Sequence, residues 1–161
     1  MNVAGTGKLP MAELRRMGTS CGFANVRTYI ASGNLLFDSD QSEGNARDAI
    51  GAELERFFGQ PIPVFVRTLA ELQATAAANP FPDEKGSRLM VFFLAEPATA
   101  AMLAEARNQA NERMALGKRE IYVAYGEGIG SSKLVIPATK QATARNINTV
   151  AKVAAMLGTA A

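Results

Sequence analysis

Leu89-Met90-Val91-Phe92-Phe93-Leu94 is an almost wholly apolar run in the second half of the chain. A short continuous apolar run of this kind is typical of a strand that is buried in the core. Downstream, residues 112–116 and 120–125 flank Gly117-Lys118-Arg119, a pattern that predicts a β-hairpin. The predicted helices of this half are one opened by Pro97, a short one capped by Ser131, and a last one with Ile147, Val150, Ala154 and Leu157 on one face and Gly158 at its end.

The first half of the chain also mixes helices and strands. Its helices are marked by apolar stripes and by end signals, such as Gly59 and the capping box Thr68-Leu69-Ala70-Glu71. Its strands are rich in β-formers, and Gly33 inside one of them predicts a bulge. The predicted elements are a helix over 9–20, a strand over 26–37, a helix over 42–58, a strand over 62–66 and a helix from 68 that ends at Asn79-Pro80.

The segment from Pro80 to Gly86 is rich in proline and charge and is the best internal boundary. We therefore predict two small α+β subdomains, residues 1–82 and 83–161, which form one compact unit. Each is expected to be a short mixed or antiparallel sheet with helices packed on it. The order of the elements favours this class over a doubly wound sheet.

The composition excludes several kinds of active site. The chain contains no histidine and one cysteine, Cys21. A Ser-His-Asp or Cys-His nucleophile is therefore impossible within the chain, as is a histidine-ligated zinc or iron site. One cysteine forms no internal disulfide and no multi-cysteine metal site. We accordingly assign no cofactor and no metal ligand, and acid–base chemistry would fall to carboxylates, lysine or tyrosine.

The distribution of apolar residues predicts a cytoplasmic protein that does not enter a membrane. No apolar run approaches the length needed to span a bilayer. The first residues, Met1-Asn2-Val3-Ala4-Gly5-Thr6-Gly7-Lys8, have no apolar core like that of a signal peptide.

Basic side chains gather at the two ends of the chain. Residues 1–35 carry four basic and one acidic side chain, and residues 128–161 carry four basic side chains and no acidic one. Chance and solvated helix faces are one explanation of this distribution of charge, and a shared anion-binding face is the other. If the two ends meet in space, they form instead a single basic face for an anion.

Three polar stretches are candidates for binding such an anion. Ala142-Thr143-Ala144-Arg145-Asn146-Ile147-Asn148-Thr149-Val150 places polar groups at a predicted helix start, where backbone N–H groups lack partners. Tyr29-Ile30-Ala31-Ser32-Gly33-Asn34 interrupts a strand, and Gly126 to Lys133 is either a nest of N–H groups or a plain flexible turn. The candidate ligand-binding residues are Lys8, Arg27, Ser32, Asn34, Ser132, Lys133, Arg145 and Asn146.

Two further patterns favour plain structural interpretations. Asp38, Asp40 and Glu43 could hold a hard cation such as Mg²⁺, but they also fit as ordinary acids before and within the first turn of a helix, which is the favoured interpretation. Gly5-Thr6-Gly7-Lys8 is not a Walker A loop, because the positions that need a glycine and a hydroxyl hold Asn2 and Leu9.

Several motifs in order resemble one bacterial family, known as domain of unknown function 1697. The resemblance covers nearly the whole chain and implies a small α+β protein of two related subdomains, with no assigned activity. Members of that family usually begin with an apolar strand before the position of Asn2, so the first strand of the N-terminal half is expected to be missing here. The motifs are Val3-Ala4-Gly5-Thr6-Gly7-Lys8-Leu9-Pro10-Met11, Arg27-Thr28-Tyr29-Ile30-Ala31-Ser32-Gly33-Asn34, Asn79-Pro80-Phe81, Ser132-Lys133-Leu134 and Thr143-Ala144-Arg145-Asn146.

The leading hypothesis is a non-catalytic binding module for a phosphorylated ligand or nucleic acid, with no catalytic residue assigned. An alternative is a hydrolase or transferase acting on an anionic substrate, with Asp38 or Asp40 holding a metal. A third is a structural protein that binds a partner. A sheet that lacks its first strand has an edge able to pair with another molecule, and the oligomeric state is left open.

Overall fold

In the computed structural model, the described residues are 2–3 and 7–159. The chain divides into two compact units, one formed by Met1–Arg67 with Ala155–Ala161 and one by Thr68–Ala154. The boundary expected between residues 82 and 83 stays a prediction.

The strands are β1 (Asn2–Val3), β2 (Gly7–Lys8), β3 (Ala24–Tyr29), β4 (Asn34–Asp38), β5 (Leu89–Phe93), β6 (Arg113–Leu116), β7 (Glu120–Ala124) and β8 (Thr143–Asn146). The helices are α1 (Met11–Ser20), α2 (Glu43–Phe58), α3 (Leu69–Ala77), α4 (Ala100–Ala104) and α5 (Ile147–Gly158), with short 3₁₀ turns η1 (Gly86–Arg88), η2 (Ile129–Ser131) and η3 (Pro137–Gln141).

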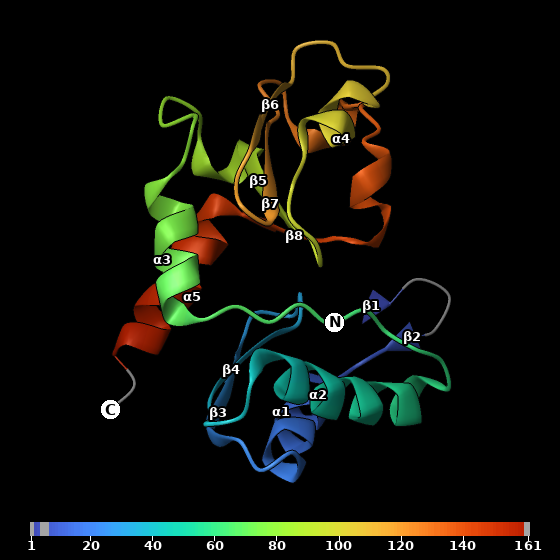
Figure 1. The fold of residues 1–161 in the computed structure, drawn as a ribbon, viewed down its shortest axis with the longest axis vertical. Coiled ribbons are helices and arrows are strands. Elements are labelled where there is room, and N and C mark those ends of the chain that lie inside the picture. Colours follow the sequence, from blue (N-terminus) through green and yellow to red (C-terminus); the bar gives the residue numbers. More distant parts are fainter. Residues whose placement is uncertain (1, 4–6, 160–161) are drawn as a thin grey trace. The chain divides into compact units, whose positions relative to one another are not determined.

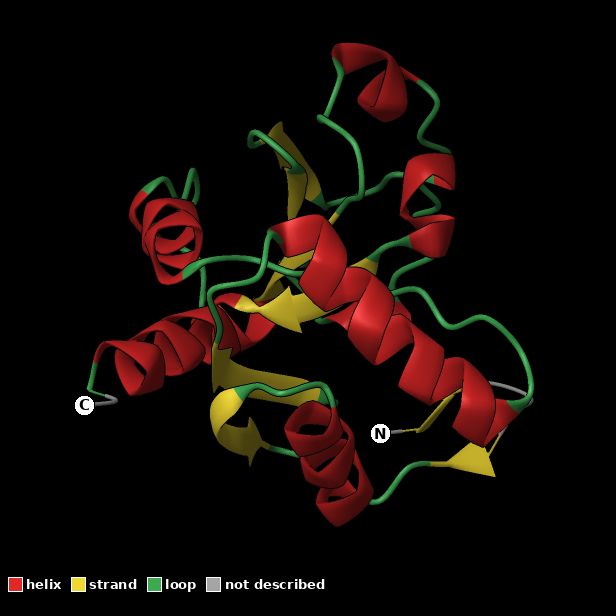
Figure 2. Ribbon diagram, turned by 60° about the horizontal axis from the view of Figure 1, so that its bottom comes forward, coloured by secondary structure: helices red, strands yellow, loops and turns green. Residues whose placement is uncertain are grey.

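The mixed α+β class is confirmed, with all paired strands antiparallel. Figure 2 distinguishes the helices, the short strands and the loops that join them. None of the described helices has both the length and the apolar character needed to cross a membrane.

The first unit packs α1 and α2 around one apolar core. The predicted ends of α2 are confirmed: the Ser42 hydroxyl accepts from Asn45 N–H at 3.1 Å, and Gly59 ends the helix in the left-handed region at φ 75°. The aromatic rings of Phe23 and Phe37 stack with centroids 3.9 Å apart. The buried members of this core are Leu9, Leu14, Met17, Phe23, Ala46, Ile50 and Leu54.

The single strand predicted over 26–37 is wrong, because the structure has a hairpin there. β3 and β4 pair through Thr28 opposite Leu35 and Tyr29 opposite Asn34. Gly33 lies in the turn at φ 93°, a conformation that costs glycine little, so it closes a turn rather than forming a bulge. Residues 30–33 therefore reverse the direction of the chain at a point where a single continuous strand was expected.

The strand predicted over 62–66 is also wrong as a member of a sheet. Within the described residues, these positions join no ladder, and in Figure 1 the green coil that leads from α2 to α3 carries no arrow. Ile62 and Val64 nevertheless pack against the core of the first unit, whereas Pro61 and Pro63 are exposed. Buried and exposed side chains thus alternate along the segment as they do in a strand, although the segment is not paired with another strand among the described residues.

The second unit contains a four-stranded sheet in the order β6-β7-β5-β8. The prediction of a central buried strand is confirmed: Leu89 and Val91 are fully buried on one face, and Met90 and Phe92 pack against a second apolar cluster. The predicted hairpin is β6 and β7. The capping box of α3 is confirmed, since Thr68 Oγ1 accepts from Glu71 N–H at 3.1 Å and Thr68 N–H donates to the Glu71 carboxylate at 3.2 Å.

Three predictions in the second unit need correction. Thr143–Asn146 is the edge strand β8 and not the start of a helix, because these residues pair with β5 from Phe93 to Met90. The turn η2 ends at Ser131 instead of beginning there, so Ser131 does not cap it as an N-cap. Helix α4 begins at Ala100, three residues after Pro97, which was expected to open it.

The start of the first unit holds a small ladder of its own. Asn2 lies opposite Lys8 and Val3 opposite Gly7, so these described residues pair with one another. Within the described residues, the sheet of β3 and β4 has two strands.

Candidate functional site

The candidate residue Arg145 lies in the edge strand β8 of the second unit. Its cross-strand neighbour is Val91, which is fully buried, so the two side chains share a face of the sheet. One guanidinium nitrogen, Nη1, donates to Thr143 Oγ1 at 2.9 Å and to the Ala144 carbonyl at 2.7 Å. Burial lowers the pKa of Arg145 from its usual value, although a guanidinium stays protonated at neutral pH. The strand thus presents a partly desolvated cation beside a hydroxyl.

Asn146 links this strand to the helix that follows. Its side-chain oxygen accepts from Thr149 N–H at 2.9 Å, three residues ahead, which is the geometry of an N-cap on α5. Asn148, in the first turn of α5, is exposed, and its side chain lies against the backbone of Gly86. The start of α5 is therefore capped from within the chain, with one exposed carboxamide next to it.

The glycine-rich loop holds Ser132 and Lys133 in a different part of the second unit. Ser132 Oγ donates to a Glu112 carboxylate oxygen at 2.8 Å, and the other Glu112 oxygen accepts from Ala110 N–H at 2.9 Å. These two hydrogen bonds, the Ala110 one first, lower the pKa of Glu112, which is buried. Ser131 Oγ donates a hydrogen bond that is shared between the Glu127 and Gly128 carbonyls. Lys133 is exposed. The ionised carboxylate of Glu112 is therefore hydrogen-bonded to the glycine-rich loop through Ser132.

The β3–β4 hairpin of the first unit uses two of its candidates to close its turn. The Asn34 carboxamide donates to the Tyr29 carbonyl at 2.9 Å and to Ser32 Oγ at 3.0 Å. Ile30 in this turn is half exposed and adopts φ 51°, which is uncommon for a β-branched residue. The side-chain bonds of Asn34 stabilise that backbone conformation.

Arg27 and Lys8, the other candidates of the first unit, differ in their surroundings. Arg27 donates to the Asn25 carbonyl at 2.6 Å and to the Met156 carbonyl at 3.0 Å, in the last turn of α5. A basic side chain at a helix C-terminus satisfies carbonyls that lack intrahelical partners. Lys8 is exposed next to the buried Leu9.

The acidic residues considered for a cation fit the structural interpretation. Asp38 accepts from the Asn25 side chain at 2.6 Å, and Glu43 is the first residue of α2. Among the described residues, no three histidine, cysteine, aspartate or glutamate side chains are grouped so that they could hold a metal ion. Burial raises the pKa of the Cys21 thiol, which disfavours the reactive thiolate.

Sequence reasoning missed a buried polar network between β7 and α3. Tyr122 Oη donates to the Thr75 carbonyl at 2.7 Å, and Thr75 Oγ1 lies 3.2 Å from a Glu120 carboxylate oxygen. Burial, followed by the charge of Glu120, raises the pKa of Tyr122 to about 12. The sequence predicted the hairpin that contains Glu120 and Tyr122, but not that α3 packs against these two side chains.

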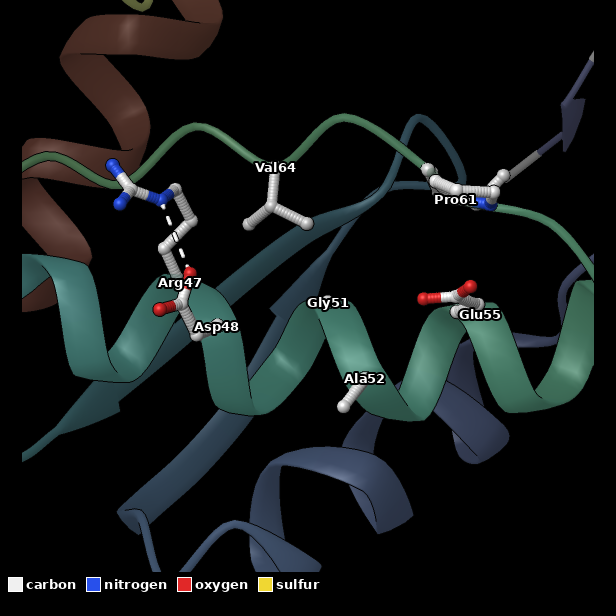
Figure 3. A pocket seen from close by; sticks show the side chains of 8 residues that line it. Arg47, Asp48, Gly51, Ala52, Glu55, Pro61 and Val64 are labelled. Atoms are coloured by element: carbon white, nitrogen blue, oxygen red, sulfur yellow. Dashed lines mark ion pairs between the residues drawn. The ribbon is translucent and has the colours of Figure 1, made fainter.

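A shallow hollow of about 330 Å³ lies between α2 and the segment 61–64, both in the first unit. Figure 3 shows Arg47 and Asp48 toward one end of it, Glu55 under Pro61 at the other, and Val64 directed toward α2 between them. Arg47 Nε lies 3.6 Å from Asp48 Oδ1. The remaining lining residues are Gly51, Ala52 and Ile62.

The eight candidate residues thus fall into two groups of four. Each group belongs to its own unit, and their assembly into one face stays a prediction. The members from the first unit are Lys8, Arg27, Ser32 and Asn34, and those from the second are Ser132, Lys133, Arg145 and Asn146.

Comparisons with known proteins identify a family and a protein of similar structure, and none of the matches carries an assigned activity. The family model described as "Protein of unknown function (DUF1697)" matches residues 1–122. A conserved bacterial protein from Streptococcus pneumoniae has a similar solved structure, with a TM-score of 0.77 and 24% sequence identity over 98% of this chain and 93% of that one. Comparison with proteins of curated function found no match.

Proposed function

We propose that this chain, which belongs to the DUF1697 family of proteins of unknown function, is a non-catalytic binding module for a phosphorylated ligand or nucleic acid. The observation that supports the proposal is the partial burial of Arg145 in the edge strand β8, which lowers the pKa of this guanidinium. Coulomb attraction strengthens as the local dielectric falls, so a partly desolvated guanidinium favours an anion more than an exposed one does.

The edge strand supports anion binding better than the glycine-rich loop does. Thr143, two residues before Arg145, shares its face of the strand and supplies a hydroxyl. Asn148 adds an exposed carboxamide in the first turn of α5. At the loop, by contrast, the buried Glu112 carboxylate already accepts from Ser132, and its negative charge opposes a bound anion.

Titration with pyrophosphate, a nucleoside triphosphate and a single-stranded oligonucleotide tests the proposal. Arg145→Ala is expected to weaken binding about 10- to 100-fold, because a hydrogen bond to a charged group contributes about 1.5–3 kcal/mol. Arg145→Lys keeps the charge but loses the planar fork, so it is expected to weaken binding less. The loss should shrink as salt is raised, since anion contacts are screened.

Arg47→Ala is the matched control, because Arg47 is exposed and pairs with Asp48 in the first unit. It is expected to leave affinity unchanged. Circular dichroism and the urea midpoint of each variant separate lost binding from lost folding. If Arg145→Ala and Lys133→Ala both fold and both bind every probe like the parent chain, the proposed function is wrong.

A further inference from the structure

The second unit holds a buried carboxylate that forms no ion pair with any described residue. Glu112, which comes just before β6, is only 4% exposed. Arg113, the next residue, pairs instead with Asp83 at 3.1 Å and with Glu84 at 3.7 Å. Buried glutamates in proteins usually have a cationic partner. The negative charge of Glu112 therefore favours a cation from outside the described part of the chain.

Tyr125 lies beside this carboxylate. Arg113 is opposite Ala124 in the ladder of β6 and β7. One step further along the same register brings Glu112 opposite Tyr125, with both side chains on one face of the hairpin. Burial, followed by the charge of Glu112, raises the pKa of Tyr125, which agrees with a short separation between the two groups.

The hydroxyl of Tyr125 has unused hydrogen-bonding capacity. The residue is 6% exposed, and its ring packs in the apolar cluster that also contains Ile121 and Val123. The hydroxyl forms no hydrogen bond with any described residue, although it is not fully removed from solvent. A polar group of a buried side chain without a protein partner indicates a bound water or ligand.

The free capacity of the two groups matches a primary ammonium group. An ionised carboxylate accepts about four hydrogen bonds. The Glu112 carboxylate accepts one from Ala110 N–H at 2.9 Å and one from the Ser132 hydroxyl at 2.8 Å. The remaining lone pairs and the Tyr125 oxygen suit the N–H donors of an ammonium group, which also neutralises the charge. A water molecule has fewer donors and no charge.

The loops next to Glu112 are fastened to each other. Arg107 and Val135 exchange two backbone hydrogen bonds, at 2.8 and 2.9 Å. Gln109 Nε2 donates to the backbone carbonyl of Glu112 at 2.7 Å. The glycine-rich loop itself carries one exposed side chain of each sign, Glu127 and Lys133. These opposite charges offset each other, so Glu112 determines which sign of ligand is favoured.

We propose that Glu112 and Tyr125 of the second unit bind a primary ammonium group, supplied by a small amine or by a lysine side chain of another protein. The Glu112 carboxylate provides the complementary charge, and the Tyr125 hydroxyl accepts a further hydrogen bond. Ser132 holds the carboxylate in place from the glycine-rich loop. This site goes beyond the anion binding proposed for β8 and does not depend on it.

Three probes of similar size test the proposal with the full chain at constant ionic strength: n-butylammonium, butyltrimethylammonium and 1-butanol. Backbone amide signals, followed by NMR, are expected to move at Ala110 and Ser132 when n-butylammonium is added. Butyltrimethylammonium has the charge but no N–H donor, so it should bind about 10-fold more weakly. The uncharged 1-butanol should not move these signals. Spermidine and Nα-acetyl-lysine amide, compared in the same way, distinguish a free amine from a protein side chain.

Tyr125→Phe keeps the packed ring and is expected to weaken n-butylammonium about 3- to 10-fold, because one hydrogen bond is lost. Glu112→Gln should reduce both cations to the level of 1-butanol, and circular dichroism checks that this variant folds. Tyr122→Phe is the matched control. Its hydroxyl donates to the Thr75 carbonyl, so affinity for the amine should stay unchanged.

Four results would overturn the proposal. Equal binding of n-butylammonium and butyltrimethylammonium would show that N–H donors are not recognised. Unmoved signals at Ala110 and Ser132 with every amine would leave water as the occupant. Equal shifts with potassium chloride would mean that any monovalent cation suffices. Binding seen only in Lys133→Met would show that the chain fills the site with its own ammonium group.

Discussion

β5 of the second unit has a hydrogen-bonded strand on each side, β7 and β8, whereas β4 of the first unit is paired with β3 alone among the described residues. Both units bury apolar clusters of comparable residue types. The difference lies in the backbone: the strands of the second unit pair in a four-stranded sheet, whereas the segment 62–66 of the first unit joins no ladder formed by described residues. An apolar alternation alone therefore does not place a segment of this chain in a ladder.

This contrast has an expected consequence for dynamics. Backbone groups in a paired central strand exchange only when the sheet opens, whereas unpaired groups near solvent exchange by small local motions. We expect the second unit to set the global stability of the chain. The first unit is then expected to open locally more readily than the second.

The largest expected effect on stability comes from shortening one apolar side chain in each unit. Leu89→Ala removes a fully buried side chain from β5 and is expected to lower the free energy of unfolding by about 2–5 kcal/mol. Val64→Ala truncates a half-buried side chain beside the open hollow, and it is expected to cost about 1 kcal/mol or less. Urea unfolding followed by residue-resolved exchange reports each unit separately. Equal losses for the two variants would mean that the segment 62–66 is as tightly held as β5.

Local patterns predicted much of the fold because their causes are local. The end of α2 at Gly59, the capping box of α3 at Thr68 and the apolar run of β5 depend on residues within one or two turns, and all are confirmed. The hairpin turn at Ile30–Gly33 was missed because its flanking strands together read as one longer strand. Its signal was present in Asn34, whose side chain bonds across the turn.

The candidate site was harder to predict, since its surroundings depend on contacts distant in sequence. Polarity singled out Arg145 as a candidate, but its place in a strand depends on pairing with Val91, far away in sequence. The partners of Ser132 and Arg27, a buried glutamate and a helix carbonyl, have no sequence signature. Polar residue types indicate capacity for hydrogen bonding, not the partner that uses it.

The second test uses the Tyr122 network, which only the second unit contains. The pKa of Tyr122 is raised to about 12, so the folded state holds a proton that the unfolded state releases near pH 10. The associated stability is fully present below pH 10 and is lost as the pH rises from 10 to 12, a loss of about 2–3 kcal/mol. Urea unfolding across this range, with exchange resolved by unit, measures it.

Tyr122→Phe provides the control for that titration. It is expected to flatten most of the alkaline decline, leaving the part due to Tyr125, whose pKa burial also raises. At neutral pH it should cost about 1 kcal/mol, because the hydrogen bond to the Thr75 carbonyl is lost. An unchanged alkaline decline in Tyr122→Phe would show that other groups control it.

The third test separates the structural and binding roles of Asn146. Asn146→Ala removes the N-cap of α5 and is expected to destabilise the second unit by about 1 kcal/mol. Asn146→Asp keeps the cap and suits the helix dipole, so stability is expected to stay within about 0.5 kcal/mol of the parent. Its added negative charge should nevertheless weaken pyrophosphate binding near Arg145. Parent-like pyrophosphate affinity in Asn146→Asp would place the anion away from the start of α5.

The smallest expected effect is a gain of stability in the first unit. Gly51 lies inside α2 next to the hollow, and an added Cβ would meet nothing within 4 Å. Gly51→Ala is therefore expected to stabilise the chain by about 0.5–1 kcal/mol, because alanine loses less backbone freedom in a helix. Gly59→Ala is the matched control on the same helix: its site is equally open, but at φ 75° alanine is strained and should cost about 1 kcal/mol. If Gly51→Ala destabilises the chain while Gly59→Ala behaves as expected, the space beside Gly51 is filled in solution, and the contrast between the paired β5 and the open surroundings of the segment 62–66 no longer holds.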